Sequence, residues 1–423
     1  MASPTEADWI EARLVAARPR AIAALLRYFR DLDLAEEAFQ EACLRALNTW
    51  PRNGPPRDAE GWLIMVGRNA ALDQVRRRAK LTGLPDEADI SDREDVEPEL
   101  AERLDAADYR DDILRLLFIC CHPELPATQQ IALALRIVSG LSVRQIARAF
   151  LVRERAMEQR ITRAKARIAR AEVPFETPGP AERADRLAVV AAMIYLLFNE
   201  GYTDANPAGD RAAFCTEAIR LARLLLRMFP AEPEIMGLLA LMLLQHSRQA
   251  ARFDADGLPI LLEDQDRSLW SQSDINEAHS LIDKAMLHRR SGPYQVQAAI
   301  AALHARARRP QDTDWEQIDR LYATLERHTP SPVVTLNRAV AVSKLHGAQA
   351  ALDMIEPLAD TLDGYFYFHG LRGALLDQLG EPTKAHEAFD RAIAHAGTAA
   401  EAAHIRQHLD RLKHGNGEST KKI

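Results

Sequence analysis

The feature that most constrains the fold is residues 141–170, where the sequence predicts two short helices joined by a tight turn. Apolar residues recur at helical spacing on both sides of the turn, with Ile146 in the first helix and Met157 and Ile161 in the second. Ser142 stands at the start of the first helix, where its hydroxyl can accept a free backbone N–H. The pattern therefore predicts two helices whose apolar faces pack against each other.

The outer face of the second helix is densely basic. A pair of short helices with a cationic second member is the layout of a helix-turn-helix that enters the major groove of DNA. For an isolated segment, a solvated basic helix is an equally ordinary interpretation. The basic residues are Arg153, Arg155, Arg160, Arg163, Lys165, Arg167 and Arg170, against Glu154 and Glu158 alone.

The charge of the chain is strongly segmental. Residues 1–83 carry 13 basic and 11 acidic side chains, whereas residues 84–112 carry 3 and 13, a net charge of −10. Residues 113–171 carry 11 and 3, a net charge of +8, and the remaining residues have a net charge of −7. A basic module behind an acidic tether favours a phosphate-binding protein over an ordinary enzyme.

Composition narrows the fold class and the compartment. Leu and Ala are abundant and aromatic residues make up only 6%, which favours a mostly helical chain of two or three domains. The polar start predicts no signal peptide, and the longest apolar runs, 187–198 and 235–244, are too short to span a bilayer. The four cysteines form no CxxC pair, so we expect a reduced, cytoplasmic protein with neither metal nor cofactor.

Three helices are predicted ahead of the acidic segment. The first two lie within residues 9–50, and a Pro- and Gly-rich loop at 51–61 separates them from a third helix at 62–80. The third helix carries Trp62 and ends in a basic cluster. Basic residues in a last helical turn are ordinary partners of the helix dipole. Together with an upstream Trp they favour a nucleic-acid surface, since such surfaces combine charge with aromatic stacking.

These motifs resemble a known family. The helix at 33–50, followed by G-W-L-x3-G-R-N-x2-L-D-x2-R-R-R, resembles region 2 of the extracytoplasmic-function sigma factors of bacterial RNA polymerase. Residues 113–170, with HPELPATQQIALALRIVSGLSVRQIARAFLVRERAMEQRITRAK, resemble their region 4. Two positions depart from the family pattern: Leu151 stands where the turn often has Gly, and Gln145 where Glu is usual.

The resemblance implies roles for residues of region 2. An acidic surface of the second helix would dock on the clamp helices of the polymerase β′ subunit. The third helix would hold the −10 element, and the loop 53–60 would receive a base of the melted strand. The residues implied in core binding are Asp33, Glu36, Glu37, Gln40 and Glu41, which we expect on polar helix faces, and those implied in −10 binding are Asn53, Trp62, Arg68, Asn69, Arg76, Arg77 and Arg78.

In region 4 the resemblance implies that the basic helix reads the −35 element. Arg155, Glu158, Gln159 and Thr162 are placed to reach base edges. Ser142, Arg144, Arg160 and Arg163 are better placed for phosphates, which position the protein without reading sequence.

We expect the segment 84–112 between the two regions to be a flexible acidic linker. Its low apolar content is typical of a solvated, disordered segment. A functional alternative is that its acids occupy basic channels of the polymerase, so that neutralising them would weaken initiation. The acids concerned are Asp86, Glu87, Asp89, Asp92, Glu94 and Asp95.

After a Pro-rich break at 174–180, helices are predicted throughout the C-terminal half, residues 181–412, ahead of a polar tail at 413–423. Gly373, Leu376, Gly380, Ala385, Phe389 and Ala392 fall at the small and aromatic positions of a tetratricopeptide repeat. The earlier helix pairs fit the repeat poorly, so we expect an all-α chain whose two sigma domains are followed by a degenerate, tetratricopeptide-like solenoid.

This half also resembles the C-terminal extension of one sigma subgroup, through stretches such as YLLFNEGY and LLEDQDRSLW. LLEDQDRSLW, at 261–270, is either an ion-paired loop between repeats or a polar regulatory contact patch. The residues of this possible patch are Glu263, Asp264, Asp266, Arg267 and Trp270.

No catalytic motif is present, since GxSxG, HExxH, P-loop and GxGxxG patterns are absent, and we expect no enzyme activity. The leading hypothesis is a sigma factor that binds core polymerase and promoter DNA and is regulated in cis by its C-terminal half. A helix-turn-helix activator with a tetratricopeptide sensor is the alternative, and a scaffold without DNA binding is a third. Region 2 distinguishes them, because an activator needs neither a polymerase-docking helix nor a melting helix.

Overall fold

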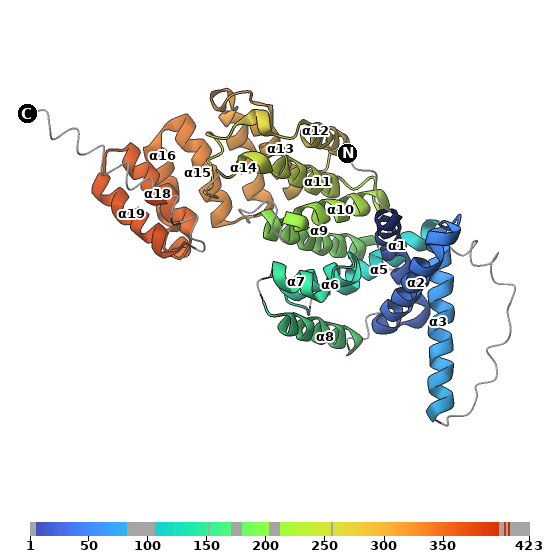
Figure 1. Ribbon diagram of the computed structural model, residues 1–423. Helices are drawn as coiled ribbons and strands as arrows, with labels where there is room; N and C mark the ends of the chain where they lie inside the picture. The colour runs from blue at the N-terminus through green and yellow to red at the C-terminus, as the bar shows by residue number, and fades with distance from the viewer. Residues whose placement is uncertain are drawn as a thin grey trace, which may run out of the picture. The chain divides into compact units, whose positions relative to one another are not determined.

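A computed structural model describes residues 6–82, 106–122, 124–150, 152–170, 180–202, 212–254 and 257–396, together with 402, 405 and 406. These residues form helices, turns and a single isolated β-bridge between Phe253 and Pro259, which confirms the expected all-α class. The chain divides into two compact units, Met1–Leu197 and Phe198–Ile423, and the division falls inside one helix. Each unit is considered by itself (Figure 1).

The first unit begins with the three predicted helices, α1 (Glu6–Phe29), α2 (Leu32–Asn53) and α3 (Ala59–Thr82). Each of the three packs on the other two. The Asp31 side chain caps α2 by accepting a hydrogen bond from the Leu34 N–H at 3.0 Å. Leu25, Phe39 and Leu63 are fully buried between the helices. Apolar spacing in the sequence thus gives this core directly.

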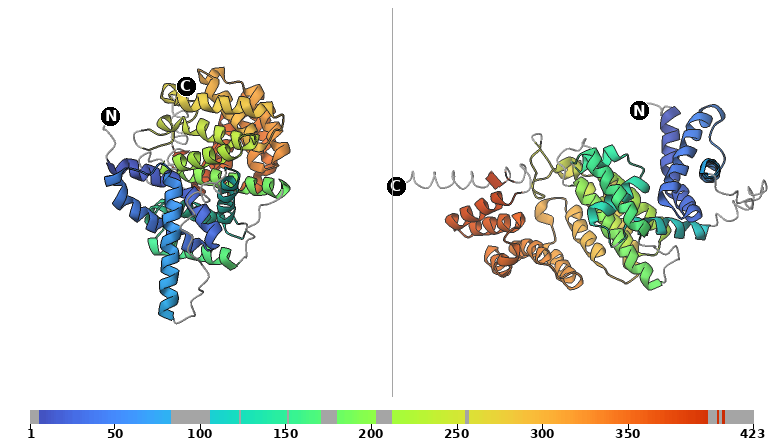
Figure 2. Two further views of the ribbon diagram at one scale, coloured as in Figure 1. Left: turned by 90° about the vertical axis from the view of Figure 1, so that its right-hand side faces the viewer. Right: turned by 90° about the horizontal axis from the view of Figure 1, so that it is seen from below.

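Helix α3 extends beyond the helices that it packs on. Its C-terminal half projects away from α1 and α2 in Figure 1 and in the left view of Figure 2. This half carries the predicted basic cluster, although the side chains of Arg76, Arg77 and Arg78 lie outside the described residues.

The predicted loop at 51–61 is shorter than expected. Helix α2 continues through Pro51 to Asn53, and α3 begins at Ala59. Gly54 follows α2 with a φ of 73°, a left-handed conformation that glycine adopts readily, and its N–H bonds to the Trp50 carbonyl. The proposed base-receiving loop therefore consists of residues 54–58, flanked by helix ends.

The second half of the unit contains α5 (Ala106–Cys120), α6 (Ala127–Ile137), α7 (Val143–Ala149) and α8 (Glu154–Arg170). Helix α5 begins at Ala106, so the prediction of a flexible linker is wrong for residues 106–112. The reason is tertiary: α5 packs on α1, and Asp112 is buried in an ion pair with Arg27 at 3.1 Å. The six acids singled out in the linker lie outside the described residues.

Helix α9 (Pro180–Tyr202) runs from the first unit into the second. The second unit continues with α10 (Ala212–Met228), α11 (Pro233–His246), α12 (Gln272–Leu287), α13 (Pro293–Arg306), α14 (Trp315–His328), α15 (Pro332–His346), α16 (Ala348–Ile355), α17 (Ala359–Leu362), α18 (Phe366–Gln378) and α19 (Pro382–Ala394). From α10 onward, each of the longer helices packs mainly on helices close to it in sequence.

The last helix pair contains the predicted small and aromatic contact. A Cβ atom added to Gly373 of α18 would lie 2.6 Å from Cε1 of Phe389 in α19, closer than real Cβ contacts allow. Phe389 is only 2% exposed. The absence of a side chain at Gly373 therefore lets the two helices approach over the Phe389 ring. The wider assignment of tetratricopeptide repeats stays a prediction.

Candidate nucleic-acid interface

Helices α7 and α8 form the predicted helix pair. Ser142 and Gln145 make a reciprocal capping box: the Ser142 hydroxyl accepts from the Gln145 N–H at 3.2 Å, and Gln145 Oε1 accepts from the Ser142 N–H at 2.9 Å. Gln145 thus performs here the capping role that a Glu can perform at the same position. Leu151, the other departure from the family pattern, lies outside the described residues.

The apolar side of α8 packs inward and its polar side faces solvent. Met157, Ile161, Ala164 and Ile168 are buried. The predicted −35 residues all remain accessible to solvent, both those at the start of α7 and those on α8. Ser142, Arg144, Arg155, Glu158, Gln159, Thr162 and Arg163 are exposed and Arg160 is half-buried.

The predicted −10 residues differ in their surroundings. Trp62 is half-buried, and its ring lies 5.5 Å from that of buried Trp50. The Arg68 guanidinium lies 5.6 Å from the centre of the Tyr28 ring in α1. Asn53 and Asn69 are exposed. Trp62 and Arg68 thus contribute to the packing of α3. If Trp62 stacks on a DNA base, it can do so only with the part of its ring that Trp50 leaves uncovered.

The predicted core-binding residues lie on α2 in two different environments. Asp33, Glu37 and Gln40 are exposed and Glu41 is half-buried. Glu36, by contrast, is only 5% exposed, so the expected polar face of α2 is covered at this position. The cause is a group of ion pairs that the sequence pattern does not reveal.

Glu36 lies at the centre of these ion pairs. Its carboxylate lies 3.5 Å from Arg18 of α1, 2.8 Å from Arg136 of α6 and 2.9 Å from Lys165 of α8. Lys165 also contacts Asp33 at 2.5 Å. Burial by itself lowers the pKa of Lys165, but hydrogen bonds to Asp33 and Glu36 outweigh burial and raise its pKa above the ordinary value. We call Arg18, Asp33, Glu36, Arg136 and Lys165 the acid clasp.

Arg18 connects α1 to the end of α6 as well. Its Nε donates to the Ile137 carbonyl at 2.9 Å and its Nη2 to the Arg136 carbonyl at 3.0 Å. A guanidinium is a favourable partner for the free carbonyls of a helix C-terminus. Burial lowers the pKa of Arg18, but a guanidinium titrates so far above neutrality that it stays charged.

Two leucines that the sequence reading missed lie on the acidic surface of α2. Leu44 is 57% exposed and Leu47 is 50% exposed. They follow Gln40 at spacings of four and three residues, so the exposed surface continues along the helix from acidic to apolar. The sequence could have indicated this surface, because Leu44 and Leu47 are apolar residues outside the helical stripe that contains Phe39.

The segment at 261–270 of the second unit is built into its surroundings. Arg267 donates to the carbonyls of His304 and Ala307 at the end of α13, and its guanidinium lies over the ring of Trp270, which is buried. Glu263 pairs with Lys344 at 2.9 Å, and Asp266 caps the short helix that follows it. Glu263, Asp264 and Asp266 are exposed. This geometry favours the ion-paired loop of the two interpretations offered above.

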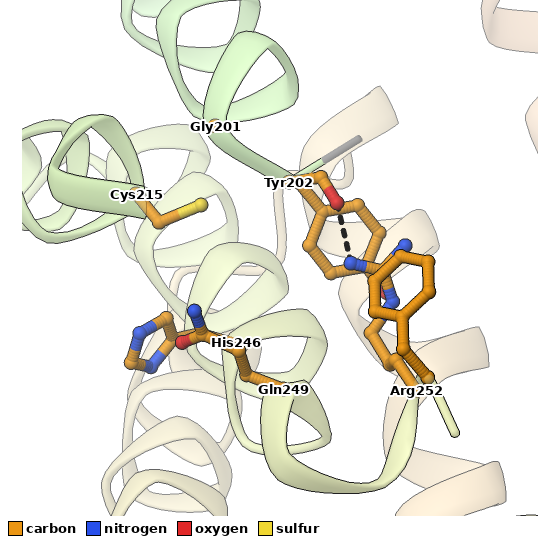
Figure 3. Close-up of a pocket in the computed structure, with 7 residues that line it drawn as sticks. Gly201, Tyr202, Cys215, His246, Gln249 and Arg252 are labelled. Carbon is orange, nitrogen blue, oxygen red and sulfur yellow. Dashed lines mark hydrogen bonds between the residues drawn. The ribbon is translucent and has the colours of Figure 1, made fainter. Parts of the chain in front are cut away.

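A small pocket of the second unit is lined by Gly201, Tyr202, Cys215, His246, Gln249, Arg252 and Phe253 (Figure 3). Arg252 stacks on the Tyr202 ring and donates to the Tyr202 carbonyl, which fills one side. Burial raises the pKa of the Cys215 thiol to about 12, so the nucleophilic thiolate is not populated near neutrality. His246 also lines the pocket, but its ring pairs with Asp274, a residue that does not line the pocket. The pocket therefore offers no activated nucleophile.

Within the described ranges, no group of three or more His, Cys, Asp or Glu side chains could hold a metal ion. A search of the same residues finds no helix that is long and apolar enough to cross a membrane.

Comparison with known proteins accounts for most of this arrangement. Residues 14–81 match the family model of sigma-70 region 2, residues 115–168 match that of sigma-70 region 4, and residues 186–286 match a family of unknown function, DUF6596. A protein of Rhizobium meliloti (strain 1021) that is described as uncharacterized is 69% identical over 409 residues, which cover 96% of this chain and 97% of that protein. Helices α1–α3 therefore correspond to region 2 and α5–α8 to region 4. The chain belongs to the sigma-70 family of transcription initiation factors, non-enzymatic DNA-binding proteins of RNA polymerase, in an extracytoplasmic-function-type architecture that continues into a DUF6596 domain.

Proposed function

We propose that the chain directs core RNA polymerase to promoters through three surfaces of its sigma domains. The surface of α2 with Asp33, Glu37, Gln40 and Glu41 docks on the β′ clamp helices, α3 holds the −10 element, and α8 reads the −35 element. The observation that carries the proposal is the continuous exposed surface of α8, where the cationic and amide side chains needed for DNA lie together.

Leu44 and Leu47 add an apolar part to the docking surface of α2. Stable protein interfaces combine an apolar centre with a polar rim. An exposed helix surface with acids at one end and two leucines at the other fits this description. We include both leucines in the core-binding set, and we include Glu36 once its ion partners are displaced.

For the C-terminal half we propose regulation in cis by a tetratricopeptide-like solenoid. The support is electrostatic: the half beyond residue 171 carries a net charge of −7 and region 4 carries +8. A negative domain in the same chain can compete with DNA for a basic surface. The Gly373–Phe389 contact supports the repeat-like packing of the last pair. The chain acts where polymerase and chromosomal DNA are, in the cytoplasm.

Reconstituted transcription tests the proposal. The full chain and a chain ending at residue 180 are each combined with purified core polymerase and a library of promoter fragments, and run-off transcripts are sequenced. Initiation that depends on the added chain and shares −35 and −10 motifs is expected. If neither form starts transcription from any fragment, the proposed function is wrong. DNA binding by the chain in the absence of any initiation would instead favour a helix-turn-helix activator.

A further inference from the structure

Three arginines of the second unit lie at the ends of two short helices that pack on each other. Arg248 precedes the 3-10 helix η1 (Gln249–Ala251) and Arg252 follows it, whereas Arg267 is the first residue of the 3-10 helix η2 (Arg267–Leu269). Helix η1 packs on η2. The fold thus brings together cations from two separate turns of the chain, and we call Arg248, Arg252 and Arg267 the arginine cluster.

The arginine cluster has no acidic partner among the residues that the structure describes. Arg248 donates to the Tyr202 hydroxyl at 2.8 Å, and Arg252 donates to the Tyr202 carbonyl. Arg267 donates to two carbonyls at the end of α13. All of these acceptors are neutral oxygens, so the hydrogen bonds leave the three positive charges uncompensated.

Acidic side chains are not scarce in this half of the chain, since its net charge beyond residue 171 is −7. Asp312 attracts Arg267 electrostatically, but its carboxylate pairs with Arg309 at 2.9 Å. Other arginines of the unit do lie within 4.0 Å of a carboxylate, and they are Arg220, Arg223, Arg290, Arg309, Arg320, Arg338, Arg372 and Arg391.

The cluster concentrates positive charge in partly buried surroundings. Burial lowers the pKa of Arg252 and of Arg267, and the charge of Arg248 lowers the pKa of both further. Burial, together with the charges of Arg248 and Arg267, lowers the pKa of His304 to about 4, so this imidazole is neutral near neutral pH. The arginines themselves stay charged, because a guanidinium titrates far above neutrality.

Donor groups at the cluster also lack an acceptor. Nε of Arg267 and Nε1 of Trp270 are buried and make no hydrogen bond to a described residue. Trp270 is 7% exposed, and the Arg267 guanidinium lies 4.9 Å from the centre of its ring. A guanidinium has five N–H donors, and a buried cation or donor without a partner costs free energy. An anion bound at the cluster would offset that cost.

Two features indicate a small anion rather than a nucleic acid. Cζ of Arg252 lies 3.5 Å and 4.9 Å from the centres of the Tyr202 and Phe253 rings, which hold its planar fork in place (Figure 3). Such a fork matches two oxygens of a carboxylate or a phosphate. The exposed acids Glu263 and Asp266, in the segment that leads into η2, would repel the extended phosphate chain of a nucleic acid.

We propose that the arginine cluster binds a small oxyanion with two negative charges, either a phosphate or a dicarboxylate. The anion accepts hydrogen bonds from all three guanidinium groups, and it ties η1 to η2 and, through Arg267, to the end of α13. That the bound anion alters transcription initiation rests on the proposed regulation in cis. The binding itself does not depend on that proposal.

Calorimetric titration of the full chain, at a constant concentration of sodium chloride, tests the binding. Inorganic phosphate and succinate are the two probes, and at least one of them should bind at one site per chain. Arg248→Gln should weaken that binding at least tenfold, because a charged hydrogen-bond donor is lost. Arg320→Gln removes an exposed arginine of α14 that pairs with Glu316, and it should leave the affinity unchanged.

Binding of phosphate alone identifies a phosphate ligand, binding of succinate alone identifies a dicarboxylate, and binding of both shows that oxyanion charge is what the site recognises. No binding of either probe up to about 10 mM overturns the proposal, as does equal binding by the unsubstituted chain and Arg248→Gln. Circular dichroism verifies that each variant folds. Arg248→Lys keeps the charge but loses the planar fork, so its affinity should lie between those of the unsubstituted chain and Arg248→Gln.

The regulatory role of the site is measured separately. Run-off transcription with core polymerase is repeated in the presence of the probe that binds, and the transcript yield should change for the unsubstituted chain but not for Arg248→Gln. An unchanged yield at saturating probe refutes the regulatory role and leaves the binding site intact. If no form of the chain starts transcription, the proposed function fails, whereas calorimetry still decides whether the cluster binds an anion.

Discussion

At the scale of single residues, the same helix uses its cations for different purposes. Lys165 and Arg163 are two positions apart on α8, yet Lys165 pairs with acids of α2 while Arg163 is exposed. Residue type and helical spacing identify α8 as a basic helix, but they do not separate a structural cation from a DNA-binding one. The two kinds of cation are distinguished only by what each face of the helix packs against in the folded protein.

Arg163 and Gln159 should affect DNA binding in different ways. Arg163→Gln should weaken binding of −35 duplexes of any sequence and reduce the slope of log affinity against log salt by about 0.9, because one phosphate contact is lost. Gln159→Ala should leave the slope unchanged and reduce discrimination between cognate and scrambled duplexes by about 1–3 kcal/mol. Fluorescence anisotropy at several salt concentrations measures both effects. Equal loss on both duplexes in Gln159→Ala would exclude a base-reading role.

Gly373 should be intolerant of any side chain. Gly373→Ala places a Cβ within 2.6 Å of the Phe389 ring, and overpacking of a buried contact should lower the free energy of unfolding by about 1–3 kcal/mol. Urea unfolding followed by circular dichroism measures the loss. The matched control is Gly364→Ala, since nothing lies within 4 Å of its added Cβ. Equal stability of the two variants would contradict the close approach of α18 and α19.

At the scale of elements, the sequence predicts most helices and their ends from local signals. The predicted N-cap Ser142 begins α7, and α3 begins at Ala59, three residues before the predicted start at Trp62. The prediction fails where a tertiary contact decides. Helix α5 begins at Ala106 inside an acidic stretch because its residues pack on α1, and no local pattern carries that information.

Helix α2 gives a prediction at this scale. Leu44→Ser with Leu47→Ser should weaken binding to core polymerase at least tenfold, because two half-exposed leucines that become buried in a complex contribute about 1–2 kcal/mol each. The fold should be unaffected, since both side chains already face solvent. Leu287→Ser, at another exposed leucine, is the control. Binding is measured by anisotropy of a labelled chain, and unchanged affinity would exclude the leucines from the docking surface.

At the scale of the whole molecule, the chain combines two sigma domains with a C-terminal half that holds more than 200 residues. The opposite charges of this half and region 4 predict that it masks the −35 reader. A chain ending at residue 180 should then bind −35 duplex more tightly than the full chain, and by a larger factor at low salt than at high salt. Circular dichroism verifies that the shortened chain folds. Weaker binding would show instead that the C-terminal half has a required, positive role.

The sequence by itself determined the helical class, the order of the sigma domains and the basic character of helix α8, because these depend on periodicity, capping and charge that act over a few residues. Tertiary structure alone decided that Glu36 is buried, that Lys165 belongs to a clasp and that residues 106–112 are helical. Each of these depends on groups that are distant in the chain, such as the 129 positions between Glu36 and Lys165. Burial of a charge depends on which partners surround it in space, and spacing along one helix does not encode those partners.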